Sequence, residues 1–129
     1  MRQKALIVED DFATRVFLRK LVEAEDCQVD EAKDGEEAMV LLAKSDYAVI
    51  LLDIALPKLS GTDILEHLFA TTPAVLEHII VVTGLNIEEI RKLFPTICNA
   101  LSKPVMPKRL MESIHKCLRT AAHEYLTSH

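Results

Sequence analysis

Short, continuous apolar runs alternate along the chain with segments in which apolar residues recur at a helical spacing. The continuous runs occupy residues 5–8, 48–52 and 79–82. Their length and their β-branched content predict strands buried on both faces, as in a parallel sheet covered by helices. A more polar run at residues 27–32 predicts an edge strand, and residues 100–102 predict a short last strand.

Between these runs the apolar period changes to about 3.6 residues, which predicts amphipathic helices. The expected buried faces are Ala13, Phe17, Leu21 and Ala24; Ala38, Leu41 and Leu42; Ile64, Leu65 and Leu68; Ile87, Ile90, Phe94 and Ile97; and Leu110, Ile114, Cys117, Leu118 and Ala121. Five strands that alternate with five helices predict an α/β domain with right-handed crossovers. We interpret these apolar stripes as core and not as cofactor-binding faces.

The composition is that of an ordinary globular protein, because half of the 129 residues are apolar and 27% are charged. This length predicts a single domain, residues 1–129, with a core of its own. The net charge of −5, without a basic cluster, argues against direct nucleic-acid binding. We find no apolar segment of about 18 residues and no signal peptide, so we expect no membrane contact and a cytosolic protein.

Cys27, Cys98 and Cys117 are odd in number and widely spaced, and none belongs to a CxxC pair. Zinc sites and disulfide frameworks normally show paired spacings. We therefore expect three reduced thiols.

The polar residues that stand out come directly after the predicted strands. They are Glu9, Asp10 and Asp11 after the first strand, Asp53 after the third, Thr83 after the fourth, and Lys103 with Pro104 after the fifth. Ligands of open parallel sheets bind beyond the carboxyl ends of the strands, at the topological switch point. If the first and third strands flank that point, Asp10 and Asp53 meet there, and Thr83 and Lys103 approach from one side.

Each of these residues also has a purely structural interpretation. The acids after the first strand could cap the next helix, a role that Asp11 or Thr14 fits. Asp53 could begin a turn, Thr83 could be a capping hydroxyl, and Lys103 could lie in an exposed loop. Their joint placement at one edge of the sheet favours a shared pocket.

Clustered carboxylates without a nearby histidine or cysteine suit a hard cation, and Mg²⁺ is the expected one. A carboxylate is also a competent nucleophile toward phosphorus and forms an aspartyl phosphate. A divalent cation and Lys103 would offset the charge repulsion of that attack, and the Thr83 hydroxyl can donate to a phosphoryl oxygen.

Four motifs in register resemble the receiver domain of two-component response regulators, over residues 4 to about 122. They are Ile7-Val8-Glu9-Asp10-Asp11 followed by Arg15, Leu51-Leu52-Asp53-Ile54-Ala55-Leu56-Pro57-Lys58-Leu59-Ser60-Gly61, Val81-Val82-Thr83-Gly84, and Ser102-Lys103-Pro104. The resemblance implies a flavodoxin-like three-layer α/β/α sandwich with a five-stranded parallel sheet of order 2-1-3-4-5 and five helices. The last helix is expected to run to about residue 126.

The resemblance also implies a role for each matching residue. Asp53 would be the phosphoacceptor, Lys103 would pair with Asp53 or the phosphoryl group, and Thr83 would move toward that group. Mg²⁺ would be held by Glu9, Asp10, Asp53 and the backbone carbonyl of Ala55. The bond between Lys103 and Pro104 would be cis. The only catalysis expected of the domain is its own phosphorylation and slow dephosphorylation.

The partners that the resemblance implies belong to a two-component or phosphorelay pathway. The donor would be a phosphohistidine of a sensor histidine kinase or of a histidine phosphotransfer protein, and a downstream protein would receive the signal. Arg15 and Arg19 are candidates for the kinase-docking face. The chain would be a monomer or a phosphorylation-dependent dimer.

Three positions and the length of one segment depart from the family pattern. Ala100 stands where the family often has an aromatic residue that turns inward when the threonine moves, and the segment from Thr83 to Lys103 is shorter than usual. Ala55 and Leu85 are apolar and cannot position an attacking water, so we expect slow hydrolysis of the aspartyl phosphate.

Three alternatives to a phosphorylated receiver remain open. A pseudo-receiver would be an interaction module that takes no phosphate, which Ala100 permits. A hydrolase of the haloacid dehalogenase type would need a second carboxylate two residues after Asp53, where Ala55 stands. FMN binding on the same fold would need a phosphate loop in place of the acids after the first strand.

Overall fold

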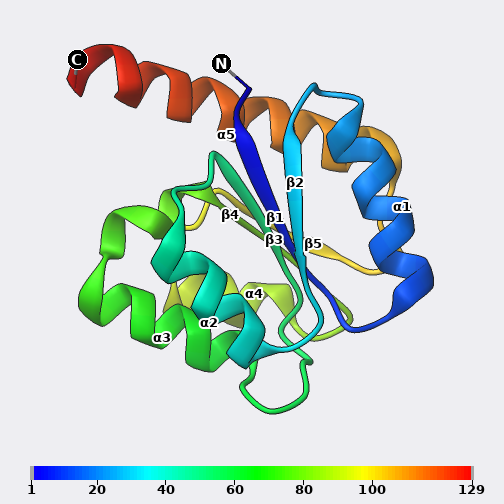
Figure 1. The fold of residues 1–129 in the computed structure, drawn as a ribbon. Helices are drawn as coiled ribbons and strands as arrows, with labels where there is room; N and C mark the ends of the chain where they lie inside the picture. The colour runs from blue at the N-terminus through cyan, green and yellow to red at the C-terminus, as the bar shows by residue number, and fades with distance from the viewer. Residues whose placement is uncertain (1, 129) are drawn as a thin grey trace.

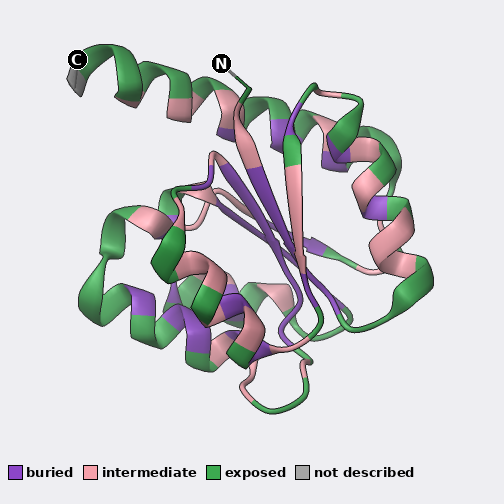
Figure 2. Cartoon of the chain, in the orientation of Figure 1, coloured by how far each residue is buried: buried purple, intermediate pink, exposed green. Residues whose placement is uncertain are grey.

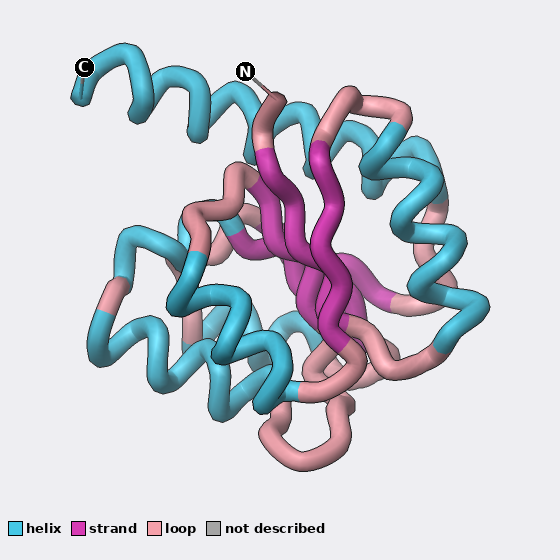
Figure 3. The backbone as a smooth tube through the Cα atoms, viewed as in Figure 1, coloured by secondary structure: helices cyan, strands magenta, loops and turns pink. Residues whose placement is uncertain are grey.

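The computed structural model describes residues 2–128, which form a central parallel sheet between two layers of helices (Figures 1 and 3). In chain order the elements are β1 (Lys4–Val8), α1 (Phe12–Glu23), β2 (Gln28–Ala32), α2 (Gly35–Lys44), β3 (Val49–Leu52), α3 (Gly61–Thr71), the 3₁₀ helix η1 (Pro73–His78), β4 (Ile79–Thr83), α4 (Ile87–Leu93), β5 (Asn99–Ser102) and α5 (Pro107–Ser128). Every predicted strand is confirmed, and so is the flavodoxin-like three-layer fold.

The strand order β2-β1-β3-β4-β5 places the switch point between β1 and β3. All four pairings are parallel, and Val8 at the end of β1 lies opposite Leu52 at the end of β3. The residues directly after these two strands therefore emerge side by side. Thr83 and Ser102, which end β4 and β5, are also paired.

The sheet is the hydrophobic centre of the molecule, because the three inner strands β1, β3 and β4 are almost wholly buried (Figure 2). Helices α1 and α5 cover one face, and α2, α3 and α4 cover the other (Figure 1). The alternate side chains of each strand enter the two cores, which explains why the inner strands are continuous apolar runs.

The predicted buried face of α1 is wrong by about one position. Leu18 and Val22 are the buried residues of this helix, whereas Phe17 is 38% exposed and Ala13 is also exposed. Helix α1 carries apolar residues on two adjacent faces. Packing against the sheet and α5 selects between them, and periodicity alone cannot.

The fourth helix is shorter than predicted, and one helical segment was missed. Helix α4 ends at Leu93, and Phe94 is its C-cap, because Pro95 disfavours a helical conformation in the residue before it. Phe94 is nevertheless buried in the core, as expected, while Ile97 packs against it from outside the helix. The missed segment is η1, which Pro73 begins.

The structure corrects the prediction of three reduced thiols. Cys98, just before β5, is joined to Cys117 of α5 by a disulfide, and their Cα atoms are 6.4 Å apart. Cys27 is a free, buried thiol. The pairing arises because β5 packs against the buried face of α5, which the spacing of the cysteines does not reveal. None of the helices within residues 2–128 has both the length and the apolar character of a membrane span.

The start of α3 packs directly on the loop after β3. Ser60 and Asp63 form a capping box at this helix end, and the Gly61 amide donates to the Ile54 carbonyl at 2.9 Å. A Cβ added at Gly61 would lie 2.5 Å from the Asp53 carbonyl oxygen and 2.6 Å from the Ile54 Cα. The absence of a side chain at Gly61 therefore lets α3 support the backbone of Asp53.

We expect Gly61→Ala to lower the free energy of unfolding by about 1–3 kcal/mol, because the new methyl group meets backbone atoms that cannot move aside. Gly84→Ala is the matched control, since a Cβ at Gly84 meets nothing within 4 Å. Its effect should stay within about 0.5 kcal/mol. Urea unfolding measures both variants, and equal losses would contradict the close approach of α3.

Candidate functional site

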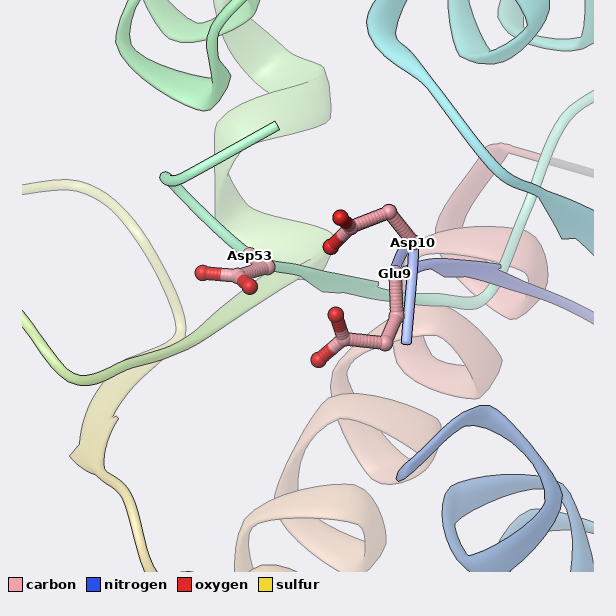
Figure 4. A group of neighbouring side chains, drawn as sticks. All are labelled: Glu9, Asp10 and Asp53. Atoms are coloured by element: carbon pink, nitrogen blue, oxygen red, sulfur yellow. The ribbon is translucent and has the colours of Figure 1, made fainter. Parts of the chain in front are cut away.

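Three carboxylates meet at the switch point of the sheet (Figure 4). Glu9 and Asp10 occupy the turn after β1, and Asp53 comes directly after β3. Each offers a ligand oxygen, and these oxygens all lie within 4.8 Å of one another. Glu9 and Asp53 are buried, while Asp10 is exposed. The convergence predicted from the strand ends is confirmed.

Lys103 connects two of these carboxylates. Its Nζ donates to Glu9 Oε1 at 2.6 Å and to Asp53 Oδ2 at 3.0 Å. The backbone fixes its position, because the Lys103 amide donates to the Thr83 carbonyl at 2.9 Å. The bond between Lys103 and Pro104 is cis, as the resemblance implied. A residue fifty positions after Asp53 thus enters the same pocket.

Glu9 is the most deeply buried acid of the site. Burial raises the pKa of its carboxyl, and hydrogen bonds from Lys103 and from the Asp11 amide offset only part of that effect. Desolvation lowers the pKa of Lys103, but its hydrogen bonds to Glu9 and Asp53 outweigh it, so the Lys103 pKa is raised. Lys103 therefore stays charged. For Glu9, the hydrogen bonds do not fully offset the free-energy cost of burying its carboxylate.

The site carries more negative than positive charge. Three carboxylates face one ammonium group, which leaves an excess of two negative charges when all are ionised. The donor set consists of carboxylate oxygens, which are the ligands that Mg²⁺ and Ca²⁺ prefer. A divalent cation would balance the excess, so the residues present fit such an ion.

Both oxygens of Asp53 have donors. The Ala55 amide donates to Oδ1 at 3.1 Å, and Lys103 donates to Oδ2. The Asp53 amide in turn donates to the Val8 carbonyl at 3.0 Å, which extends the β1–β3 pairing by one residue. This pairing aligns the Asp53 carboxylate with the turn that carries Glu9. The role of the Ala55 carbonyl as a ligand stays a prediction.

Thr83 ends β4, the neighbour of β3, and is fully buried. Its hydroxyl accepts a hydrogen bond from the Leu85 amide at 3.2 Å. A hydroxyl held in this way keeps its own proton available for another acceptor. Movement of Thr83 toward a phosphoryl group stays a prediction.

Among the acids after β1, Asp11 has the capping role that the sequence suggested. It caps α1 through the amide and hydroxyl of Thr14.

The surroundings of the site hold contacts of three arginines that the sequence did not reveal. Arg91 of α4 donates to the Ala100 carbonyl of β5 at 2.7 Å, so α4 is tied to β5 where the family often has an aromatic residue. Arg15 and Arg19 of α1 both bind Glu31 of β2. The charged residues of α1 gave no sign that these two arginines face the sheet edge.

Comparison with known proteins gives a consistent result. The family model of the response regulator receiver domain matches residues 5–115. Among curated proteins, the transcriptional regulatory protein SrrA of Staphylococcus aureus is 28% identical over 123 residues, which cover 92% of this chain and 49% of SrrA. The chain therefore spans about half the length of the curated relatives that it matches.

Solved structures show the same fold. A CheY-like receiver domain protein from Methanospirillum hungatei has a TM-score of 0.83 and 28% identity, over 96% of this chain and 99% of its own. The signal receiver domain of a LuxO repressor protein from Vibrio parahaemolyticus has a TM-score of 0.88 and 24% identity, and the match covers 100% of this chain and 99% of that domain. The receiver domain of the sensor kinase PA1611 from Pseudomonas aeruginosa has a TM-score of 0.78 and 22% identity, and the match covers 92% of this chain and 98% of that domain. That structure has a magnesium ion in its active-site cleft.

We expect Glu9→Gln to raise the free energy of unfolding by about 1 kcal/mol near neutral pH without divalent cations, because the amide removes a buried charge. The pKa of Glu9 is higher in the folded chain than in the unfolded chain. The ionised carboxylate therefore destabilises the folded chain most at pH values above the folded pKa, and this destabilisation fades as the pH falls toward 4.5. The gain in the free energy of unfolding that Glu9→Gln produces should fade in the same pH range.

Asp10→Asn is the control, because it makes the same change of charge on an exposed side chain. Its effect without cations should stay within about 0.5 kcal/mol. Urea unfolding in a chelating buffer at several pH values measures both. If Glu9→Gln unfolds more easily than the wild type, the ion pair with Lys103 outweighs the cost of burial.

Proposed function

The chain belongs to the response regulator receiver domain family, and on that premise we propose that Asp53 accepts a phosphoryl group from a phosphohistidine. The observation that carries this proposal is the ion-paired cluster, in which Lys103 bridges Glu9 and Asp53 beside Asp10. Such a cluster combines a nucleophilic carboxylate, a cation site and a fixed ammonium group.

The proposed reaction is a displacement at phosphorus. An Asp53 carboxylate oxygen forms the new O–P bond, the N–P bond of the donor breaks, and the leaving imidazole nitrogen takes the bonding pair and then a proton from water. Lys103 already contacts Asp53 Oδ2, so its charge lies next to the incoming phosphoryl oxygens. Thr83 would donate its hydroxyl proton to the phosphoryl group.

Mg²⁺ is the cation that we propose for the site. Glu9, Asp10, Asp53 and the backbone carbonyl of Ala55 would hold it, with water completing the coordination. When bound, the ion neutralises charge on the transferring phosphoryl group. Support comes from the three converging carboxylates and from the magnesium described for the related PA1611 receiver domain.

The proposed chemistry also determines the partners. A sensor histidine kinase or a histidine phosphotransfer protein would supply the phosphoryl group, and a downstream protein would read the change. Because the phosphoryl group of such donors comes from ATP, we place the chain in the cytoplasm. We propose that residues 4–122 form the core of the receiver module and that it acts as a phosphorylated switch and not as a substrate-processing enzyme.

Phosphorylation should be visible by intact-mass spectrometry after incubation with acetyl phosphate and Mg²⁺. We expect the wild type to gain the mass of one phosphoryl group, and Asp53→Asn to gain none, because the amide is not a nucleophile. Asp46→Asn is the control, since Asp46 is an exposed acid in the loop before β3.

The same experiment distinguishes the alternatives. No mass gain in the wild type would favour a pseudo-receiver that serves only as an interaction module. A gain that persists in Asp53→Asn would place the phosphoryl group on another residue. A requirement for the cation is checked by repeating the reaction with a chelator.

The phosphorylated form should be long-lived, because Ala55 and Leu85 bear no polar group that could orient a water. Leu85 is 53% exposed and Ala55 is also exposed, so both positions accept polar side chains. We expect Ala55→Asn and Leu85→Glu each to shorten the half-life of the aspartyl phosphate several-fold, since an amide or carboxylate can position the attacking water.

Ala43→Asn on the exposed side of α2 and Leu93→Glu on α4 make the same chemical changes away from the site. The half-life is obtained from the loss of the phosphoryl mass with time after the phosphodonor is removed. Equal half-lives in the site variants and the controls would show that these two positions do not govern hydrolysis.

A further inference from the structure

Arg15 is oriented inward, toward the acidic turn after β1. Its Nη1 donates to the Glu9 carbonyl at 2.9 Å and lies 3.4 Å from the Asp10 carbonyl. Its Nε donates to Glu31 Oε1 at 3.2 Å. Only 11% of its side chain is exposed, and the guanidinium lies over the Phe12 ring at 5.7 Å from the ring centre. An arginine held this way is a fixed part of the site's frame and not a free surface cation.

Glu31 anchors this contact to the sheet. It lies in β2, opposite Ile7 of β1, two residues before Glu9. Its second oxygen, Oε2, accepts from Arg19 Nη1, so both oxygens of the Glu31 carboxylate are engaged from α1. The Arg15 guanidinium is therefore held by a β2 side chain through its Nε, and it contacts the turn after β1 through its Nη1.

The turn needs such support, because it lies beyond the end of β1. Glu9 keeps one backbone contact to β2, in which its amide donates to the Ala32 carbonyl at 3.1 Å. Its own carbonyl and that of Asp10 point to Arg15. The directions of two successive carbonyl groups fix the peptide planes, and these planes set the direction of the Glu9 and Asp10 side chains.

We propose that Arg15, oriented by Glu31, is a positioning residue of the cation site: it holds the peptide groups of Glu9 and Asp10 so that their carboxylates converge with Asp53 before a cation binds. The inference rests on the proposed function of that site. Groups that orient metal ligands commonly change metal affinity by about 10–100-fold when they are removed.

The sign of the effect separates positioning from simple electrostatics. Removal of a positive charge beside an acidic site should strengthen cation binding, because the repulsion between like charges is lost. Loss of positioning should weaken it. A weaker affinity in an Arg15 variant therefore opposes the electrostatic effect of the substitution and cannot arise from it.

The test is the affinity of the full chain for Mg²⁺ by isothermal titration calorimetry, with circular dichroism to verify folding. We expect Arg15→Ala to raise the dissociation constant by about tenfold or more. Arg15→Lys keeps the charge but cannot bridge Glu31 and the carbonyls with a planar fork, so it should also bind more weakly. Arg19→Ala is the matched control: it removes one positive charge and one partner of Glu31 but leaves the turn untouched, and its dissociation constant should stay within about twofold.

Glu31→Gln provides a second variant, in which Arg15 remains but loses its charged anchor. It should also weaken Mg²⁺ binding, although the loss of one negative charge acts in the same direction. Arg15→Lys, which conserves the charge, therefore keeps the proposal testable if Arg15→Ala does not fold. Unchanged or tighter binding in the folded Arg15 variants would overturn the positioning role and leave the proposed function standing. Failure of the wild type to bind Mg²⁺ would instead overturn the proposed function itself.

Discussion

The structure depends on one electrostatic constraint, which is that two buried carboxylates share a single lysine at the carboxyl edge of the sheet. Glu9 and Asp53 are 1% and 5% exposed, and Lys103 Nζ contacts both. Ionised carboxylates at this burial are unfavourable unless they are paired. The pocket therefore holds an unbalanced negative charge, and this imbalance makes the site receptive to a divalent cation.

The apolar sheet makes this arrangement possible. Strands β1, β3 and β4 are buried on both faces and pair in parallel, so their carboxyl ends meet at one edge whichever residues come next in the chain. The charged groups need only begin where the apolar runs end. Gly61 and the capping box of α3 then support the Asp53 loop, and Arg15 supports the acidic turn from α1.

The strands and the position of the site could be predicted from the sequence because both depend on short stretches of adjacent residues. A continuous β-branched run marks a buried strand, and the first polar residue after it marks the sheet edge, as Asp53 does after Leu52. The predicted buried face of α1 was wrong because Phe17 and Leu18 lie on adjacent faces and only tertiary packing selects Leu18. The Cys98–Cys117 pairing and the Arg15–Glu31 contact join elements that no spacing rule relates.

The region around Ala100 shows how a chain can keep the chemistry of a pocket and alter its surroundings. Ala100 is buried and carries no group that could turn inward or outward, so its side chain cannot report a change at Thr83. The backbone at this position is instead bound by Arg91, which also contacts the Asn99 side chain and Glu88 of its own helix. Ala100 lies opposite Val81 and Thr83 lies opposite Ser102, so the ladder of the sheet joins β4 to β5. The hydrogen bond from Arg91 to the Ala100 carbonyl then joins β5 to α4. Backbone pairing and one guanidinium group therefore connect the strand of Thr83 to an outer helix, and this connection contains no aromatic side chain.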